Sequence, residues 1–158
     1  MTLIRIRDAV AADLDEPIVG GSGGEYREQL TRHLAGAEAG EAAVFVAEVD
    51  GRVVGRAFVE QSGDPPVAWL GGVLVEDAHR RQGIATALVD YAEKQTVKLG
   101  RDELRLSVGV DNVGAQRLYL RRGYWTIGKG FSPGLTLSDG TLVHPREAVW
   151  VMSRSLAG

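Results

Sequence analysis

The chain has 158 residues, the length of one ordinary domain, with 44% hydrophobic and 25% charged residues, so neither general disorder nor a fibrous repeat fits its composition. Its formal net charge is -3, whereas nucleic-acid binding generally needs a basic surface, so we expect no nucleic-acid partner. It contains no Cys, which excludes disulfides, thiolate metal sites and cysteine nucleophiles.

The N-terminal segment shows no targeting signal. Charged residues occur from Arg5 onward, which leaves no apolar core of the kind that signal peptides have. Nowhere does the sequence contain an apolar run long enough to span a bilayer. His33, His79 and His144 are not spaced as metal ligands. We therefore expect a cytoplasmic protein with no membrane partner and no metal.

The first forty residues predict a strand followed by two helices. Alternating apolar and polar residues predict a strand over 3–7, and a short helix is expected over 10–14. Ser22 and Glu25 have the spacing of a capping box, and apolar residues recur behind them at helical intervals. This pattern predicts an amphipathic helix over 25–37.

Three strands are expected in the middle of the chain. The segments 43–49 and 52–60 are rich in Val and Phe, and Asp50-Gly51 between them is a strong signal for a type I′ hairpin turn. The segment 67–75 is apolar almost throughout, which is typical of a strand buried on both faces.

The second half of the chain predicts the rest of an α/β fold, with a long loop at 131–145. The expected elements are a helix at 83–99, a strand at 103–108, a helix from Asn112 to Arg122, and strands at 124–129 and 148–152. Strand 67–75, helix 83–99 and strand 103–108 should form one right-handed parallel β-α-β crossover. We predict a single domain over residues 1–158, with a mixed, mostly antiparallel sheet flanked by helices.

The turn before the long helix has the features of a phosphate site. Gly83 and Ala85 are small, so a ligand can approach the main chain closely. The free N–H groups of a helix's first turn and the helix dipole both favour an anion. Arg80 and Arg81 add positive charge. The same residues fit an ordinary strand–helix turn with a solvated arginine pair equally well.

A second element follows the strand at 103–108. Asn112 opens a helix there, and Tyr119 lies seven residues later, about two turns at roughly 3.6 residues per turn, so the two share a face. An amide and a phenol are thereby expected near the carboxyl edge of the sheet, where α/β proteins bind ligands. Taken alone, these residues also fit a helix cap and a half-buried core tyrosine.

Together the two elements resemble the GNAT superfamily of acyl-CoA-dependent N-acetyltransferases. The stretch Arg80-Arg-Gln-Gly-Ile-Ala85 resembles the R/Q-x-x-G-x-G/A signature of that family. The second element resembles the N-x-x-A-x-x-L-Y…G-F/Y pattern, with matches at Asn112, Ala115, Leu118, Tyr119, Gly123 and Tyr124. The predicted order of helices and strands matches as well, so the resemblance covers nearly the whole chain.

The resemblance implies transfer of an acetyl group from acetyl-CoA to a primary amine by direct attack in a ternary complex. Tyr119 would be catalytic, by protonating the departing thiolate. The main chain of 73–75 would pair with the pantetheine arm, and that of 81–86 would hold the pyrophosphate. The implied cofactor-binding residues are Val73, Leu74, Val75, Arg80, Arg81, Gln82, Gly83, Ile84, Ala85, Thr86 and Asn112.

The general base is not identified by the sequence. Segment 69–74 contains no carboxylate, and Ser107 stands where one branch that acetylates protein termini has a glutamate. The remaining candidates are also readily explained as surface charges or caps: Glu60, Asp64, Glu76, His144 and Glu147. A chain of water molecules could also serve. Arg121 and Arg122 either approach the 3′-phosphate of CoA or are solvated charges at a helix end.

The acceptor is expected to be a small-molecule amine, because a weakly acidic protein suits a cationic acceptor. The resemblance implies that loop 131–145 and the helix carrying Tyr26 wall the acceptor site. Two alternatives stay open, namely a protein N-terminus or lysine as acceptor, and a non-catalytic sensor that binds acyl-CoA. The acyl-chain preference and the oligomeric state, including a homodimer, also stay open.

Overall fold

The computed structural model describes residues 3–157 as one seven-stranded sheet with helices on both faces. The strand order is β1-β2-β3-β4-β5-β9-β6. Within the described residues, β4 and β5 form the only parallel pair, which confirms the mixed, mostly antiparallel sheet. The strands are β1 (Ile4–Asp8), β2 (Ala43–Val49), β3 (Arg52–Ser62), β4 (Val67–Val75), β5 (Glu103–Gly109), β6 (Trp125–Ser132) and β9 (Glu147–Ser155).

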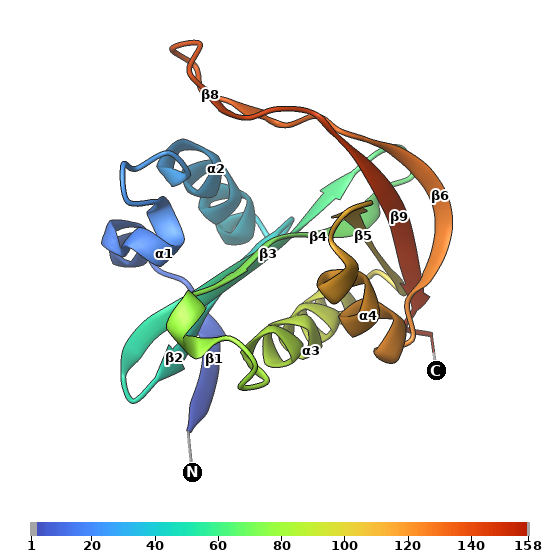
Figure 1. Ribbon diagram of the computed structural model, residues 1–158, viewed down its shortest axis with the longest axis horizontal. Helices are drawn as coiled ribbons and strands as arrows, with labels where there is room; N and C mark the ends of the chain where they lie inside the picture. The colour runs from blue at the N-terminus through green and yellow to red at the C-terminus, as the bar shows by residue number, and fades with distance from the viewer. Residues whose placement is uncertain (1–2, 158) are drawn as a thin grey trace.

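The helices form a layer on each side of the sheet (Figure 1). Helices α1 (Pro17–Gly20) and α2 (Arg27–Glu38) cover one face together with the 3-10 turn η1 (Ala11–Asp15). Helices α3 (Ile84–Lys98) and α4 (Val113–Arg121) lie on the other, and η2 (Asp77–His79) precedes α3. Each face has its own apolar core, the larger under α3. Among residues 3–157, no helix is both long and apolar enough to cross a membrane.

The turn between β2 and β3 confirms the hairpin prediction. Asp50 has a φ of 53° and Gly51 a φ of 79°, and a type I′ turn needs positive φ at both central residues. The turn sets β2 and β3 in antiparallel register at the centre of the face that α2 covers.

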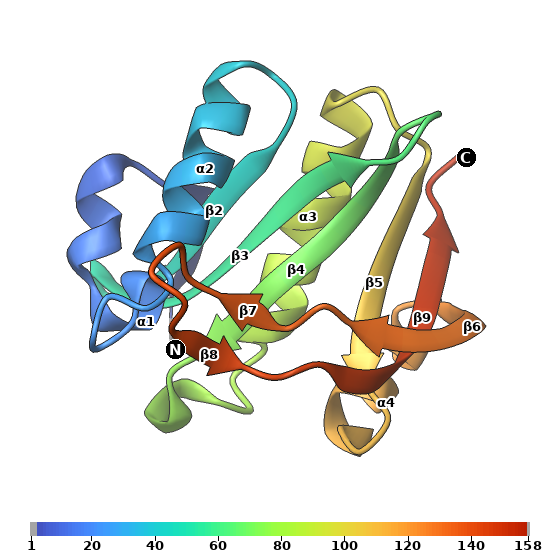
Figure 2. The same ribbon diagram turned by 90° about the horizontal axis from the view of Figure 1, so that it is seen from above.

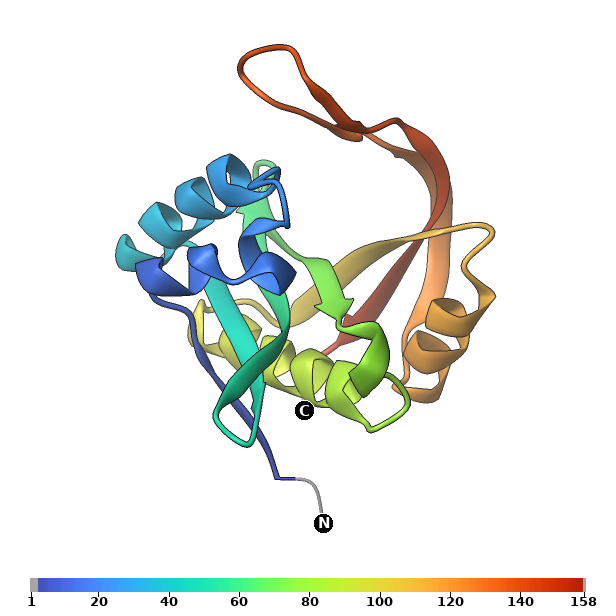
Figure 3. The same ribbon diagram turned by 60° about the vertical axis from the view of Figure 1, so that its left-hand side comes forward.

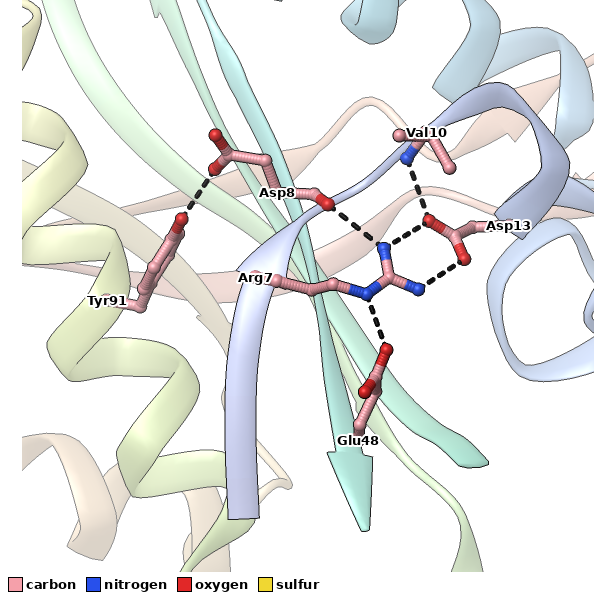
Figure 4. A network of polar contacts seen from close by, with 6 residues as sticks. All are labelled: Arg7, Asp8, Val10, Asp13, Glu48 and Tyr91. Carbon is pink, nitrogen blue, oxygen red and sulfur yellow. Dashed lines mark hydrogen bonds and ion pairs between the residues drawn. The ribbon is translucent and has the colours of Figure 1, made fainter. Parts of the chain in front are cut away.

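The edge strand β1 is attached to η1 by a cluster of charged groups (Figure 4). Arg7 donates to both carboxylate oxygens of Asp13, at 2.8 and 2.9 Å, and to Glu48 on β2 at 2.5 Å. These bonds hold the pKa of Asp13 below its usual value. The Tyr91 hydroxyl of α3 donates to Asp8 at 2.6 Å, so β1 is tied to both helical layers.

The capping-box prediction at the start of α2 was wrong. The helix begins at Arg27 with Tyr26 as its N-cap residue and no side-chain cap. The Glu25 carboxylate instead accepts a hydrogen bond from the N–H of Gly23 at 2.9 Å, so it stabilises the glycine-rich turn rather than the helix. The preceding segment is also more regular than a plain break, because α1 starts at a proline in its first turn.

Strands β4 and β5 are in contact only at one end. Their pairing covers residues 68–70 of β4 and 104–106 of β5, and Figure 2 shows the two arrowheads apart. Partly exposed and buried residues alternate up to Leu70, and most of the residues after it are partly exposed, so the prediction of a strand buried on both faces was wrong. The second half forms one wall of a cleft.

The segment predicted as the loop 131–145 is mostly a β arm. Strand β6 runs on to Ser132, and β7 (Leu135–Thr136) pairs with β8 (Leu142–His144) in a separate sheet. The arm leaves the β6–β9 edge and crosses toward α2 (Figures 2 and 3). At its tip, the N–H and hydroxyl of Ser138 donate to the Glu28 carboxylate of α2, both at 3.2 Å. Sequence patterns missed this hairpin because its strands have only two and three residues.

Candidate active site

A cavity of about 830 Å³ opens where β4 and β5 separate. It is lined by the second half of β4, the η2–α3 turn, the end of β5 and the inner side of α4. Every catalytic or cofactor-binding residue that the resemblance implies lines this cavity except Gln82, which is exposed. The lining members of that set are Val73, Leu74, Val75, Arg80, Arg81, Gly83, Ile84, Ala85, Thr86, Asn112 and Tyr119.

The start of α3 presents main-chain donors to the cavity. Gly83 is the N-cap residue with a φ of 81°, and no side chain caps the helix. The N–H groups of Ile84, Ala85 and Thr86 belong to the first turn, so they have no acceptor within the helix. The geometry therefore gives an anion site with free donors and the positive end of a helix dipole.

The arginine pair beside this turn contributes less charge than its sequence indicates. Arg80 is exposed, and its guanidinium lies 3.0 Å from the carboxylate of Asp77. An exposed pair of this kind is screened by solvent. Arg81 adopts a φ of 64°, which is unusual for a residue with a side chain, and it lines the cavity together with Gly83.

The cavity side of β4 is a free strand edge. Leu74 pairs with Arg56 of β3 and Val75 with Gly55, whereas the described part of β5 pairs with no β4 residue beyond Leu70. Main-chain N–H and C=O groups that lack a neighbouring strand can bind an extended ligand as an added strand would. The segment Val73–Val75 thus offers amide-to-amide hydrogen bonds.

Tyr119 is the buried phenol of the cavity. Its side chain is only 8% exposed, and burial raises its pKa to about 12. The hydroxyl therefore stays protonated at neutral pH and can donate. Its ring packs edge-on against Tyr124, with 5.8 Å between the ring centroids. The Tyr124 hydroxyl is already used, because it donates to Glu93 of α3 at 2.8 Å.

Asn112 is the N-cap of α4. Its side-chain oxygen accepts a hydrogen bond from the N–H of Ala115 at 3.2 Å, so the cap interpretation of this residue is correct. The residue also lines the cavity. Because the oxygen is occupied by the helix, the side-chain NH₂ is the group with which Asn112 can bind a ligand.

Glu147 is the only one of the base candidates that lines the cavity. Its carboxylate lies against the end of β5, where a Cβ on Gly109 would be 3.2 Å from Oε2. The others are used or placed elsewhere: Glu60 lies beside His33 under α2, and Glu76 pairs with Arg52 at 2.5 Å. Asp64 is in the β3–β4 turn and His144 on the arm.

The two arginines at the end of α4 have different surroundings. Arg121 lines the cavity, whereas its neighbour Arg122 pairs with Asp90 and Glu93 of α3. Arg56 was missed altogether, although it lies in the core and donates to Gly72 of β4. The signal that could have found it is a single charge within the apolar run 53–59.

These groups fit acetyl-CoA. The anion site at α3 suits a diphosphate, the free edge of β4 suits the amides of a pantetheine arm, and the protonated phenol of Tyr119 suits a sulfur leaving group. All three line one cavity. Fold and site together have the features expected of acyl-CoA-dependent acyltransferases.

Comparison with protein families gives the same class. The family model described as "Acetyltransferase (GNAT) family" matches residues 9–124, which is most of the chain, so the protein belongs to the GNAT acetyltransferase family. The matched region contains α3, α4 and every implied catalytic and cofactor-binding residue, whereas Glu147 lies beyond it.

Among curated proteins, the chain is 35% identical over 85 residues to an uncharacterized N-acetyltransferase of Methanocaldococcus jannaschii, covering 51% of this chain and 38% of that protein. It is 34% identical over 105 residues to N-acetyltransferase 8 of Mus musculus, covering 63% of this chain and 46% of the relative. The chain thus spans less than half the length of these relatives. Among solved structures, yncA from Salmonella typhimurium, determined with its cofactor acetyl-CoA, has the same fold, with a TM-score of 0.71, 19% identity and coverage of 97% and 94%.

Proposed function

We propose that this protein is an N-acetyltransferase that moves an acetyl group from acetyl-CoA to a primary amine, and that residues 1–158 make up its single N-acetyltransferase domain. The observation that carries the proposal is the cavity in which free main-chain donors of α3, the free edge of β4 and the buried hydroxyl of Tyr119 come together. Family membership and the acetyl-CoA in the Salmonella typhimurium structure support it.

Three groups of the chain bind different parts of acetyl-CoA. The N–H groups of 81–86 hold the diphosphate, the main chain of Val73–Val75 pairs with the pantetheine arm, and the side-chain NH₂ of Asn112 adds a further hydrogen bond. Acetyl-CoA supplies a thioester that is already activated, so the chain needs no nucleophile of its own. This agrees with a sequence that has no Cys.

Two side chains transfer protons, one as a donor and the other as an acceptor. The Tyr119 hydroxyl, protonated at neutral pH, donates a proton to the departing thiolate. Glu147 attracts the ammonium form of the acceptor and takes its proton, directly or through water, because it is the carboxylate among the base candidates that lines the cavity. The transfer is a direct attack by the neutral amine.

A small-molecule amine is the favoured acceptor. The β7–β8 arm crosses the sheet on the α1–α2 side and is bonded to Glu28 at its tip (Figure 2). An arm attached at both ends narrows access from this side, which favours a small acceptor over a folded protein. The formal charge of -3 also suits a cationic acceptor.

The test is release of the CoA thiol from acetyl-CoA with two sets of acceptors. One set contains small primary amines, such as diamines, polyamines and aromatic amines, and the other contains peptides with a free N-terminus or a free lysine. The proposal predicts turnover with small amines. Turnover with peptides alone would favour a protein acceptor, and tight CoA binding without thiol release in either set would favour a sensor.

A further inference from the structure

The core under α2 contains a buried arginine. Arg56 on β3 is 3% exposed, and its guanidinium carbon lies 4.6 Å from the centre of the Tyr26 ring. Burial lowers its pKa, so its charge is costly at this position. Within the described residues, the one hydrogen bond that its side chain makes goes to the main chain of β4, where Nη1 donates to the carbonyl of Gly72 at 2.5 Å.

This hydrogen bond lies at a bulge in β4. Arg56 pairs with Leu74 and Phe58 with Gly71, so β4 uses one more residue than β3 between these pairs. The extra turn of the chain depends on Gly72, whose φ is 61°; a Cβ there would lie 2.5 Å from Arg56 Nη1. The side chains of Arg56 and Phe58, which both lie against Gly72, therefore determine the shape of the bulge.

The bulge also determines where one N–H group points. Gly72 and Val73 share a peptide unit, and in a trans peptide the C=O and N–H groups point in opposite directions. Because the Gly72 carbonyl points to the guanidinium of Arg56, the Val73 N–H points away from that guanidinium. Val73 lines the cavity and Arg56 does not, so we infer that this N–H is directed into the cavity.

We propose that Arg56 is a positioning residue for acetyl transfer. The resemblance to GNAT enzymes already implies that an N–H of 73–75 polarises the acetyl carbonyl; the role inferred for Arg56 is to fix the Gly72–Val73 peptide and thereby the direction of the Val73 N–H. The inference rests on the proposed function. A cation bonded to the carbonyl also polarises the peptide unit and makes its N–H a stronger donor. Such a donor gains strength as negative charge develops on the carbonyl oxygen during attack.

The test measures the stretching frequency of the acetyl carbonyl in bound acetyl-CoA. Acetyl-CoA labelled with ¹³C at the carbonyl is bound to the full chain, and its stretching frequency is measured by infrared difference spectroscopy. In the wild-type protein we expect the band at lower frequency than in free acetyl-CoA. In Arg56→Met the band should return toward the free value, and kcat with the best small amine should fall about tenfold, less than the roughly 10²–10³-fold loss of an entire oxyanion donor.

Controls separate positioning from stability. CoA lacks the acetyl carbonyl, so its Kd should stay at the wild-type value in Arg56→Met. Arg56→Lys keeps the charge, so its band should lie between those of wild type and Arg56→Met, and it decides the question if Arg56→Met does not fold. Arg7→Gln removes a hydrogen-bonded arginine from the distant strand β1 and should lower the melting temperature without moving the band.

The outcomes distinguish this inference from the proposed function. An unchanged band in Arg56→Met or Arg56→Lys, with CoA still bound, would overturn the role of Arg56. A wild-type band at the free frequency would overturn the role of the Val73 N–H and leave the proposed function standing. No binding of CoA by the wild-type protein would contradict both.

Discussion

The cavity beside β4 and the core under α2 differ in the kind of group that forms them. On the cavity side lie 73–75, 81 and 83–86, whose main-chain groups we propose bind CoA, and we call these residues the main-chain wall. On the α2 side, Arg56 and Phe58 of β3 pack against Tyr26 and His33, and we call these four residues and their neighbours the side-chain wall. A main-chain wall is sensitive to changes in backbone conformation and tolerates most side chains, whereas a side-chain wall depends on which residues it contains.

Burial has chemical consequences on the side-chain wall. His33 stacks on Phe58 with 4.1 Å between ring centroids, and burial lowers its pKa to about 4. Burial likewise raises the pKa of Glu60. The imidazole is therefore neutral at neutral pH, which excludes a strong ion pair across the 3.7 Å between His33 and Glu60. His33 is therefore held by stacking on Phe58 rather than by an ion pair with Glu60.

The largest effect is expected at Tyr119, the side chain that the main-chain wall places for chemistry. Tyr119→Phe should lower kcat roughly 10²–10⁴-fold by removing a general acid, with the Kd of CoA unchanged by calorimetry. Because the pKa of this hydroxyl is about 12, the wild-type rate should not fall through its ionisation until the pH approaches that value.

Tyr124→Phe is the matched control for this substitution. It removes a neighbouring hydroxyl that bonds to Glu93 outside the cavity, so it should lower stability and leave kcat near the wild-type value. Equal rate losses in the two variants would mean that Tyr119 acts through packing.

The next effect concerns Glu147. Glu147→Gln should lower kcat/KM for the amine roughly 10²-fold, at the lower end of the range of losses expected for an acid–base group, and leave CoA binding intact. Glu60→Gln is the control, since Glu60 lies on the side-chain wall and does not line the cavity. If Glu60→Gln has the larger effect on thiol release, the acceptor approaches from the side-chain wall.

A smaller effect separates the two roles of Asn112. Asn112→Ala should cost about 1 kcal/mol of unfolding free energy, as the loss of an N-cap does. Asn112→Asp keeps the oxygen that accepts from Ala115, so its stability in urea unfolding should be close to wild type. Its CoA affinity should nevertheless fall severalfold, because the NH₂ donor is gone. Full affinity in Asn112→Asp would restrict this residue to capping.

The smallest effect is expected for the exposed side chains beside the start of α3. Arg80→Ala and Gln82→Ala remove exposed side chains from the turn before α3, and each should weaken CoA binding about threefold or less, in line with the small value of exposed polar and charge interactions. A loss of a hundredfold in either variant would show that side chains, rather than N–H groups, hold the diphosphate.

The sequence predicts the parts of the site that depend on local backbone. Gly83 at the start of α3 is recognisable in the site, as is the Asp50–Gly51 turn elsewhere in the fold, because their conformations need specific residues. The bulge at Gly72 could not be predicted, since it arises from contacts with Arg56 and Phe58 on another strand.

The β7–β8 arm was missed for a similar reason. It is held in part by a bond between Ser138 and Glu28, which are 110 residues apart in the chain. Local patterns report hydrophobic period and turn residues, and neither contains such a distant contact.

The most direct measurement is a crystal structure of the full chain with CoA. The account predicts the diphosphate within hydrogen-bond distance of the N–H groups of 81–86, the pantetheine arm alongside Val73–Val75, and the sulfur next to the Tyr119 hydroxyl. A diphosphate held by arginine side chains away from the start of α3, or a sulfur remote from Tyr119, would contradict it.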